Sequence, residues 1–269
     1  MQKKISVIIP TLNEERDLPR LLRDFQKQTN KNFEIIIVDA QSKDNTVEQA
    51  LTFKDTLPLS VVKSGRANVS HQRNLGARHA NEDYLFFIDA DSQIADTCIE
   101  RLIQSINDYR FLIFLLTLVP NSSTYSDELL FNVINYGVEL SQRISQPMSN
   151  GGSMVMHKVL FELLKGFDER IYLSEDHDII KRAQKIGVSA KYLKNVKLKV
   201  SLRRLNKDGF IPVLYKYSLA FMYTLAKGRI DKKLFNYEMG GAAYDAKPSK
   251  EQFQQIKKLY KLLKNILEE

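Results

Sequence analysis

Short apolar runs alternate with longer amphipathic stretches over the first third of this chain, and this alternation limits the fold more than any other feature. The runs, rich in β-branched and aromatic residues, predict strands at Ile5–Ile9, Phe33–Val38, Leu59–Val62 and Tyr84–Ile88. The stretches between them carry apolar residues at helical spacing and predict helices near Glu14–Gln28, Asp44–Lys54 and Ser70–Ala80. Strands joined by helices form parallel βαβ units, and strands that are apolar at successive positions are typical of a sheet covered on both faces.

After Asp91 the alternation is less regular, but helices and strands continue. We expect helices near Asp96–Asp108 and Asp127–Ile144, a helical region ending at Lys165-Gly166, and strands at Phe111–Val119, Met154–Met156 and Val196–Leu202. Residues 1–205 therefore predict an α/β domain, a Rossmann-like α/β/α sandwich with a mostly parallel central sheet. Residues 206–269 predict a helical C-terminal extension, with an aromatic-rich helix at Phe210–Ala226 and an amphipathic helix at Ser249–Leu267.

The charges of the chain are unevenly distributed. Its 269 residues carry a formal charge of +8; residues 181–269 hold 21 Lys and Arg against 7 Asp and Glu, whereas residues 1–180 hold 19 against 25. A basic segment of this kind is either a solvated face or a surface that attracts anionic lipid or a phosphate-bearing substrate. The chain has no recognised nucleic-acid-binding motif, so we expect no nucleic-acid partner.

Two features indicate where the protein acts. The apolar stretch Phe210–Ala226 is broken by Lys216 and falls short of the ~18 apolar residues of a spanning helix, so we expect peripheral membrane contact through the basic C-terminal region. The chain has one cysteine, Cys98, which cannot form an internal disulfide. We therefore expect a cytoplasmic protein that contacts the inner face of the cell membrane.

Polar residues follow the predicted strands at the edge where a doubly wound sheet binds its ligands. The first strand is followed by Pro10-Thr11-Leu12-Asn13-Glu14, the second by Asp39 and the fourth by Asp89-Ala90-Asp91. Asp89 and Asp91 are two residues apart and point the same way, so both can approach one hard cation such as Mn²⁺ or Mg²⁺. An acidic turn before the next helix is the alternative for this pair. Asp39 offers an acceptor to a ribose or a base, unless it only completes a turn.

Charged residues later in the chain can complete such a site. Glu175 and Asp176 open a predicted helix, where a carboxylate can take the proton from an attacking hydroxyl or can simply favour the positive end of the helix dipole. Arg203 and Arg204 offer paired guanidinium groups to a phosphate, with a solvated basic loop as the alternative. Arg73 begins a helix and can face the same ligand.

Two further observations narrow the function. Neither glycine-rich phosphate loop follows the first strand, which disfavours both a dinucleotide oxidoreductase and a P-loop protein. His177, next to Asp176, is expected on the surface of its helix rather than in a catalytic role.

Taken in order, several segments resemble the family 2 glycosyltransferases of the GT-A fold. They are SVIIPTLNEE (Ser6–Glu15), IIIVDAQSKDNT (Ile35–Thr46), GRA (Gly65–Ala67), QRNLGARHA (Gln72–Ala80), FFIDADS (Phe86–Ser92), GGSMVMHK (Gly151–Lys158), GFDE (Gly166–Glu169), SEDHDIIKRAQKIG (Ser174–Gly187) and SLRR (Ser201–Arg204). Each segment alone is a weak signal, but the ordered set covers most of residues 5–204. The resemblance implies a donor-binding half of about residues 1–92 and an acceptor half of about residues 93–205.

The resemblance also implies a role for each candidate residue. Those expected to contact the sugar-nucleotide donor are Pro10, Thr11, Glu14, Asp39, Arg73, Asp89, Arg203 and Arg204. Asp91 and Asp89 would hold the metal, and Gly151 and Gly152 would line the acceptor side. Asp176 would be the general base, with Glu175 beside it. The chain departs from the commonest pattern at Ala40, where many relatives carry a second acid.

We therefore expect a metal-dependent inverting glycosyltransferase. It would move a sugar from a nucleotide-diphosphate sugar, with a UDP-sugar favoured, to a hydroxyl of a glycan, a lipid carrier or a small molecule, in cell-surface polysaccharide or glycolipid synthesis. The alternatives are a polyprenyl-phosphate sugar synthase and a catalytically silent protein that binds nucleotide sugars. A sugar-1-phosphate nucleotidyltransferase is disfavoured, because its first strand resembles G-x-G-x-R-x-x-P and this one ends in Pro-Thr-Leu-Asn-Glu.

Overall fold

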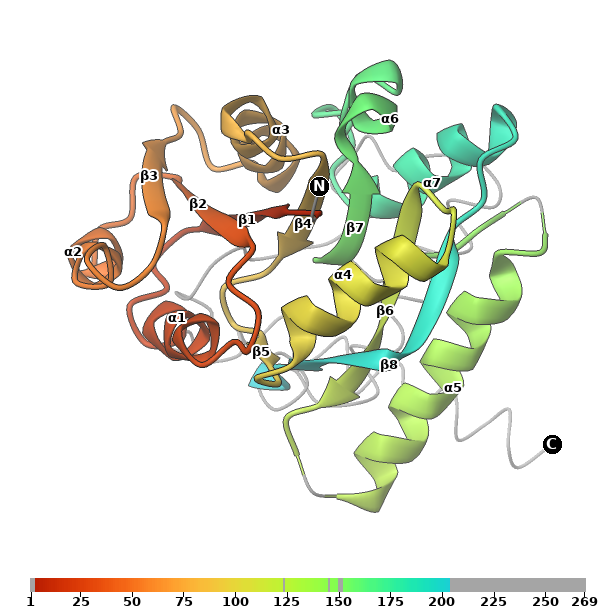
Figure 1. The fold of residues 1–269 in the computed structure, drawn as a ribbon, viewed down its shortest axis with the longest axis horizontal. Helices are drawn as coiled ribbons and strands as arrows, with labels where there is room; N and C mark the ends of the chain where they lie inside the picture. Colours follow the sequence, from red (N-terminus) through yellow and green to blue (C-terminus); the bar gives the residue numbers. More distant parts are fainter. Residues whose placement is uncertain (1–2, 123, 145, 150–151, 204–269) are drawn as a thin grey trace, which may run out of the picture.

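The structure is a computed structural model that describes residues 3–122, 124–144, 146–149 and 152–203 (Figure 1). The strands are β1 (Ile5–Thr11), β2 (Phe33–Asp39), β3 (Leu59–Lys63), β4 (Tyr84–Ile88), β5 (Gln93–Ile94), β6 (Ile113–Pro120), β7 (Ser153–His157) and β8 (Lys191–Val200). The helices are α1 (Leu18–Gln26), α2 (Thr46–Leu51), α3 (Val69–His79), α4 (Cys98–Asp108), α5 (Tyr125–Ser141), α6 (Lys158–Leu163) and α7 (Glu175–Lys185). Within these residues, no helix is both long enough and apolar enough to span a membrane.

All of these strands form one sheet in the order β3-β2-β1-β4-β7-β6-β8-β5. The first four strands of this order pair in parallel, as the alternation of strands and helices predicts. β7 then runs antiparallel to both β4 and β6, β8 is parallel to β6, and the short β5 is antiparallel to β8. Four of the seven strand pairs are parallel, so the predicted mostly parallel sheet is confirmed.

Helices cover both faces of the sheet, and each face has its own apolar core. On one face, side chains of α1, α2 and α4 pack over strand residues such as Val7 and Ile9. On the other face, α3, α5, α6 and α7 pack over residues such as Ile8 and Phe87 (Figure 1). Successive strand residues enter opposite cores, which explains why both must be apolar. The predicted α/β/α sandwich is therefore confirmed.

Within the described residues, the strands and helices expected from the sequence are found within a few residues of their predicted bounds. Two strands show what the pattern missed. β5 has only two residues, too few for a periodic signal, and β8 begins at Lys191, five residues before the expected start. The early part of β8 carries exposed lysines and a change of register opposite Leu116 and Thr117, so its sequence does not show a regular apolar pattern. The expected helices at Phe210–Ala226 and Ser249–Leu267 lie outside the described residues.

The close packing of α3 on the sheet depends on Gly76. A Cβ atom there would lie 2.5 Å from Ile8 Cγ2 and 3.1 Å from Val38 Cγ2. We predict that Gly76→Ala lowers the free energy of unfolding by about 1–3 kcal/mol, because the helix must move off β1. Gly137→Ala is the matched control: a Cβ atom in the middle of α5 meets nothing within 4 Å, and the change should stabilise by about 0.5–1 kcal/mol. Urea denaturation measures both, and equal effects would contradict the packing described.

Candidate functional site

The carboxyl ends of β1, β2 and β4 lie side by side, because β1 pairs in parallel with both of its neighbours. Thr11 ends β1 opposite Asp39, the last residue of β2, and Asp89 follows β4 directly. The polar residues that follow these strands in the sequence therefore gather at one edge of the sheet.

Asp39 is a buried carboxylate held by its neighbours. Its Oδ1 accepts a hydrogen bond from Thr11 Oγ1 (3.1 Å), and its Oδ2 accepts one from the Ser42 amide (2.9 Å). Gln72 of α3 donates to the carbonyl oxygens of Thr11 (3.0 Å) and Val38 (2.8 Å). These bonds fix the ends of β1 and β2 in a shape that keeps an oriented acceptor at the sheet edge.

Arg73 joins the end of β4 to the start of α7. Its guanidinium is buried, with Nη2 2.9 Å from Asp89 Oδ1 and Nη1 2.7 Å from Glu175 Oε1. The group lies over the Phe167 ring, 5.6 Å from the ring centre, and its Nε is buried with no hydrogen-bond partner. A buried charge of this kind is stable only because both carboxylates compensate it. The two ion pairs of Arg73 hold Asp89 in a fixed position relative to α7.

The first turn of α7 brings Glu175 and Asp176 to the same place. Both residues are buried, and both lie close enough to Arg73 to interact with its charge. Burial raises the pKa of Glu175, although the adjacent Arg73 guanidinium opposes the rise. His177 Nε2 donates to the carbonyl oxygen of Ser149 (3.0 Å), so this histidine anchors the segment before β7. The expected surface position of His177 is therefore only partly right, because its side chain is mostly covered.

Gly152 packs against Asp89. Its φ is +68°, a left-handed conformation that favours glycine, and a Cβ atom would lie closer than 3.0 Å to each carboxylate atom of Asp89. The residue before β7 therefore has to be small if Asp89 is to keep its position. Gly151, the other residue expected on the acceptor side, lies outside the described residues.

Arg203 holds a second group of acids. Its Nη atoms each donate to one oxygen of Glu14 (3.0 Å each), its Nε is 3.2 Å from Asp91 Oδ2, and its Nη1 is 3.4 Å from Asp17 Oδ2. Burial raises the pKa of Glu14 to about 7, with Arg203 opposing the rise. Arg20 adds an ion pair to Asp17 (2.6 Å). Arg204 lies outside the described residues.

The residues at Asp89 and Asp91 fit a divalent cation that also binds a diphosphate. Their carboxylate oxygens are the hard ligands that Mn²⁺ and Mg²⁺ prefer, and the Asp91 carboxylate already contacts a cationic group, Arg203. In the part of the chain that the structure describes, no group of three or more His, Cys, Asp or Glu side chains could hold a metal ion by itself. A cation here would therefore need oxygens from its ligand and from water.

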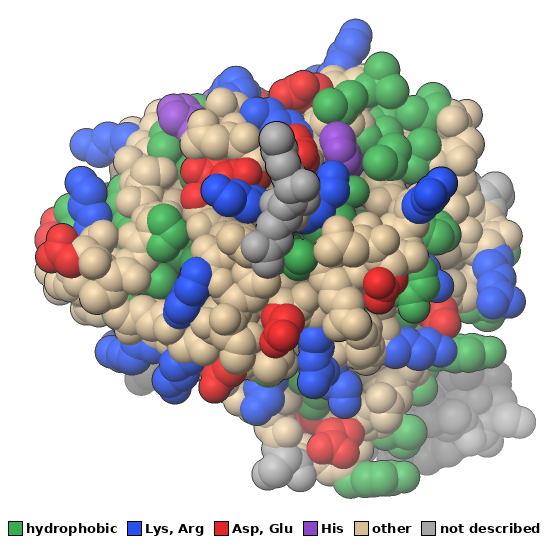
Figure 2. Space-filling model, in the orientation of Figure 1, with side chains coloured by type: hydrophobic (Ala, Val, Ile, Leu, Met, Phe, Trp, Pro, Cys, Tyr) green, Lys and Arg blue, Asp and Glu red, His purple; other side chains and the backbone are tan. Residues whose placement is uncertain are grey.

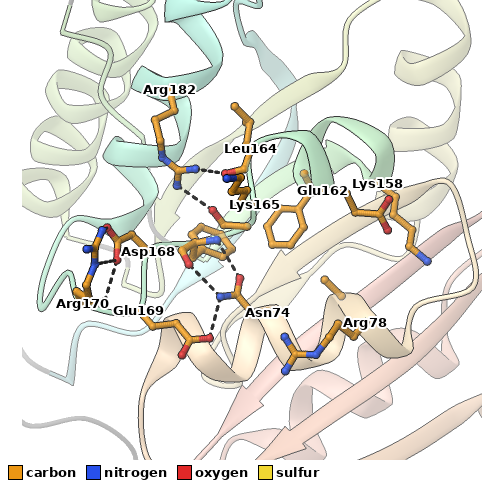
Figure 3. A pocket seen from close by; sticks show the side chains of 14 residues that line it. Asn74, Arg78, Lys158, Glu162, Leu164, Lys165, Asp168, Glu169, Arg170 and Arg182 are labelled. Carbon is orange, nitrogen blue, oxygen red and sulfur yellow. Dashed lines mark hydrogen bonds and ion pairs between the residues drawn. The ribbon is translucent and has the colours of Figure 1, made fainter.

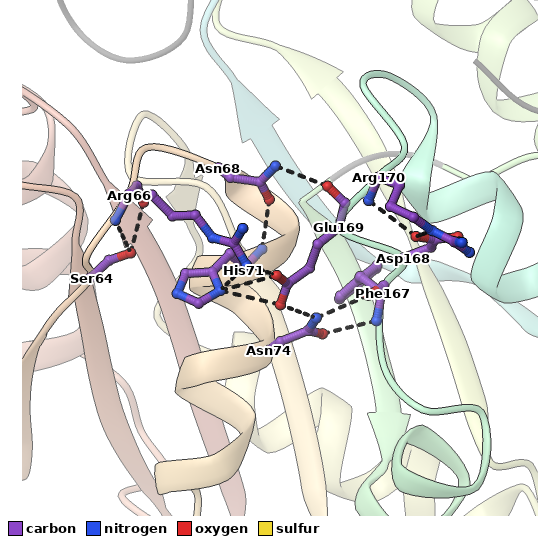
Figure 4. A network of polar contacts seen from close by, with 9 residues as sticks. All are labelled: Ser64, Arg66, Asn68, His71, Asn74, Phe167, Asp168, Glu169 and Arg170. Atoms are coloured by element: carbon purple, nitrogen blue, oxygen red, sulfur yellow. Dashed lines mark hydrogen bonds and ion pairs between the residues drawn. The ribbon is translucent and has the colours of Figure 1, made fainter. Parts of the chain in front are cut away.

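A separate polar network links α3 to the loop after α6 (Figure 4). Glu169 accepts a hydrogen bond from Asn74 Nδ2 (3.1 Å), lies 3.2 Å from His71 Nδ1 and forms an ion pair with Arg66. Burial by itself would raise the pKa of Glu169. The hydrogen bonds from Asn74 and His71 and the charge of Arg66 outweigh burial and lower that pKa. This network fixes the loop that carries Phe167 under Arg73.

A cavity of about 620 Å³ is lined by α3, α6 and that same loop, with Asn74 and Glu169 among its lining residues (Figure 3). Arg182 at its wall donates to the carbonyl oxygens of Leu164 and Gly166, and Arg170 pairs with Asp168 (2.8 Å). These cations are held by partners within the chain. Basic and acidic side chains are also interspersed over the face of the molecule seen in Figure 2.

The structure brings together most of the candidate residues that it describes. Arg73, Asp89, Glu175 and Asp176 form one group, and Glu14, Asp91 and Arg203 form another, with Asp89 and Asp91 only two residues apart. Thr11 and Asp39 are in contact, and Pro10 is the half-buried neighbour of Thr11 in β1. Asp17 and Arg20 were not expected near this site, because they lie at the start of α1 and resemble ordinary helix-end charges.

The fold and the acidic sheet edge define a protein of the GT-A fold. Two solved structures share it. One is residues 1–349 of Staphylococcus aureus TarS in complex with UDP, which has a TM-score of 0.59 and 20% identity over 74% of this chain and 61% of that chain. The other is the mannosyltransferase PcManGT from Pyrobaculum calidifontis in complex with GDP-Man and Mn²⁺, which has a TM-score of 0.61 and 18% identity over 81% of this chain and 65% of that chain. The chain belongs to glycosyl transferase family 2, since the model of that family matches residues 6–162.

Two curated relatives extend this result. The poly(ribitol-phosphate) β-N-acetylglucosaminyltransferase TarP of Staphylococcus aureus is 34% identical over 104 residues, 37% of this chain and 32% of TarP. The GalNAc(5)-diNAcBac-PP-undecaprenol β-1,3-glucosyltransferase of Campylobacter jejuni is 25% identical over 177 residues, 64% of this chain and 57% of that enzyme. The matched region spans about a third of the length of the first curated relatives.

The buried position of Arg73 gives a testable energy. We predict that Arg73→Met destabilises the protein by about 3–5 kcal/mol, because Glu175 is left buried without a counter-charge. Adding Glu175→Gln should recover about 1–3 kcal/mol, since the other partner, Asp89, is 43% exposed and can be solvated. Urea denaturation of the two single variants and the double variant measures the coupling. Additive effects within about 0.5 kcal/mol would contradict the pairing.

Proposed function

We propose that this protein is a metal-dependent inverting glycosyltransferase. It transfers a sugar from a nucleotide-diphosphate sugar, with a UDP-sugar favoured, to an acceptor hydroxyl in the synthesis of a cell-surface polysaccharide or glycolipid. The observation that carries this proposal is the contact of one buried guanidinium, Arg73, with both Asp89 and Glu175. This contact places Asp89, which suits a metal-bound diphosphate, beside the first turn of α7, whose acids Glu175 and Asp176 suit proton transfer.

The donor lies across the ends of β1, β2 and β4 in this proposal. Pro10, Thr11, Glu14 and Asp39 surround the nucleoside, and the oriented acceptor oxygens of Asp39 suit a base or a ribose hydroxyl. The structural neighbours support a sugar-nucleotide ligand, since TarS is described with UDP and with UDP-GlcNAc, and PcManGT with GDP-Man.

The diphosphate carries the charge that grows during the reaction. A divalent cation, Mn²⁺ or Mg²⁺, held by Asp91 and Asp89, would stabilise that charge when bound. The Mn²⁺ described with PcManGT supports this assignment. Arg203 and Arg204 supply guanidinium groups that can bind the departing diphosphate through paired hydrogen bonds.

Asp176 acts as the general base. It takes the proton from the acceptor hydroxyl while the acceptor oxygen attacks the anomeric carbon from the side opposite the nucleotide, and the sugar therefore inverts. Its position supports this role, because it is buried in the first turn of α7 and interacts with the Arg73 charge that also holds Asp89. Glu175 is held by Arg73 and orients this turn.

The acceptor approaches on the side of Gly151 and Gly152, and Gly152 packs directly against the Asp89 carboxylate. A glycan, a lipid carrier and a small molecule all offer the required hydroxyl. The undecaprenol-linked substrate in the name of the Campylobacter relative favours a lipid-linked acceptor. We therefore propose a cytoplasmic protein that contacts the membrane peripherally.

Described residues also offer a surface for that contact. One face of α5 exposes Tyr125, Leu129, Val133, Tyr136 and Leu140. The exposed Lys194 of β8 lies beside it, paired with Glu139 of α5 (2.9 Å). An exposed apolar helix face is a surface by which a peripheral protein enters the interface of a bilayer.

For the base, we predict that Asp176→Asn lowers the release of UDP from a UDP-sugar in the presence of Mn²⁺ by about 100-fold or more, because no carboxylate remains to take the proton. The dissociation constant for UDP, measured by titration calorimetry, should change little. Asp178→Asn is the matched control, because Asp178 lies in the same turn but pairs with Arg182 (2.7 Å). Full turnover by Asp176→Asn would assign the base to another group.

For the membrane surface, we predict that Val133→Asp lowers binding to phosphatidylglycerol vesicles by about fivefold or more, because a charge enters the apolar face of α5. Leu163→Asp is the control, since Leu163 on α6 is equally exposed, at 68% against 64%, but lies on another surface. Co-sedimentation measures both variants. Equal binding by the two would remove α5 from the proposal.

A further inference from the structure

Arg203 forms an ion pair with Asp91, the carboxylate that a metal ion bound to the donor diphosphate would need. The residue lies just beyond the end of β8 at Val200, and its side chain is only 14% exposed. It contacts Glu14 through two hydrogen bonds and places Nε 3.2 Å from Asp91 Oδ2. The guanidinium therefore lies where a cation bound to Asp91 would experience its charge directly.

We propose that Arg203 is an exchangeable internal counter-ion: it neutralises Asp91 in the donor-free protein and gives up that carboxylate when the cation and the nucleotide diphosphate bind together. The exchange rests on the proposed function, because its ligand is the donor of that reaction. It adds a role in the order and cooperativity of binding, before any diphosphate departs.

The first support is the charge balance of the group. Glu14, Asp17 and Asp91 are three acids around one guanidinium, and all three have mostly covered side chains. Acids at such positions are destabilising unless a cation compensates them. Arg20 compensates in part, through its ion pair with Asp17, but its Nη2 donates to the main-chain carbonyl of Asp91 (3.3 Å). Among the described residues, Arg203 thus places a positive charge directly at the Asp91 carboxylate.

The second support is the chemistry of the two cations. A guanidinium and a divalent cation repel each other, so binding of the cation to Asp91 weakens the hold on Arg203. The diphosphate then offers Arg203 a replacement, since its oxygens accept the same paired hydrogen bonds that Glu14 accepts now. The cation alone weakens the ion pair between Arg203 and Asp91, and the diphosphate alone offers Arg203 a new partner. Since the exchange needs both, the cation and the nucleotide should bind cooperatively.

The third support is the position of Arg203 in the chain. The pairing of β8 with β6 ends at Val200, opposite Pro120. Arg203 lies beyond that pairing, so its side chain can turn from the acids to a diphosphate without breaking the sheet.

The exchange predicts effects of opposite sign for one substitution. We expect Arg203→Gln, in the full-length chain, to bind Mn²⁺ about 10-fold more tightly than the wild type in the absence of nucleotide, because the competing charge is gone. The same variant should bind UDP about 10-fold more weakly in the presence of Mn²⁺. The electron paramagnetic resonance signal of free Mn²⁺ measures the first affinity, and titration calorimetry measures the second. A purely structural role for Arg203 would weaken both.

Two variants control for charge and for folding. Arg20→Gln removes the same charge from the same group of acids but not from the Asp91 carboxylate, so its gain in Mn²⁺ affinity should stay below about threefold. Arg203→Lys keeps the charge and should bind Mn²⁺ as the wild type does. Thermal melts of all three variants report their folding.

Three results would overturn the exchange: unchanged or weaker Mn²⁺ binding by Arg203→Gln, an equal gain in Arg20→Gln, or an equal gain in Arg203→Lys. If the wild type binds UDP with Mn²⁺ while any of these results is found, the exchange fails and the proposed function stands. If the wild type binds none of UDP, GDP and dTDP in the presence of Mn²⁺, the proposed function fails and the exchange fails with it.

Discussion

The buried guanidinium of Arg73 is the interaction on which the rest of the site depends. It comes from α3, on one face of the sheet, and contacts the acid that follows β4 and the acid that opens α7. These two acids are 86 positions apart in the chain, and without a shared cation their charges would repel each other in a poorly solvated place. The fold contributes to this contact through Phe167 under the guanidinium and through Asn74, which holds the loop that carries that ring.

A common arrangement underlies the whole site. Each acid suited to binding a metal-bound diphosphate is paired with an arginine from another part of the chain: Asp89 with Arg73, and Asp91 with Arg203. The two arginines differ in burial and in position. Arg73 is inside the molecule and has two acidic partners, one directly after β4 and one in the first turn of α7, which suits a permanent structural role. Arg203 follows the last described strand and lies nearer to the surface. The same type of ion pair can thus fix one half of a site and leave the other half able to respond to a ligand.

Much of the fold followed from the sequence, because buried parallel strands show uninterrupted apolar runs and the amphipathic helices between them show a clear period. Strands β1 to β4 and helices α1 to α4 illustrate this. The mixed half of the sheet was harder to predict, because the first half of β8 has no regular apolar pattern and β5 is too short to have one. Asp89, Asp91 and Asp176 could be selected because they follow strands or open a helix. Their arginine partners could not be paired with them, since contacts such as that of Arg203 with Glu14 join residues 189 positions apart. Nor does the sequence show that Gly152 must leave room for Asp89.

The central claim is that a cation, a nucleotide diphosphate and a proton acceptor share one edge of the sheet. Anomalous diffraction at the manganese edge, from crystals grown with Mn²⁺ and UDP, tests it most directly. We expect one strong anomalous peak within coordination distance, about 2.0–2.6 Å, of an Asp91 oxygen, with the diphosphate bound to the metal and Asp176 facing the same cleft. A peak away from Asp89 and Asp91, or a UDP molecule bound elsewhere while this edge remains closed by Arg203, would contradict the account.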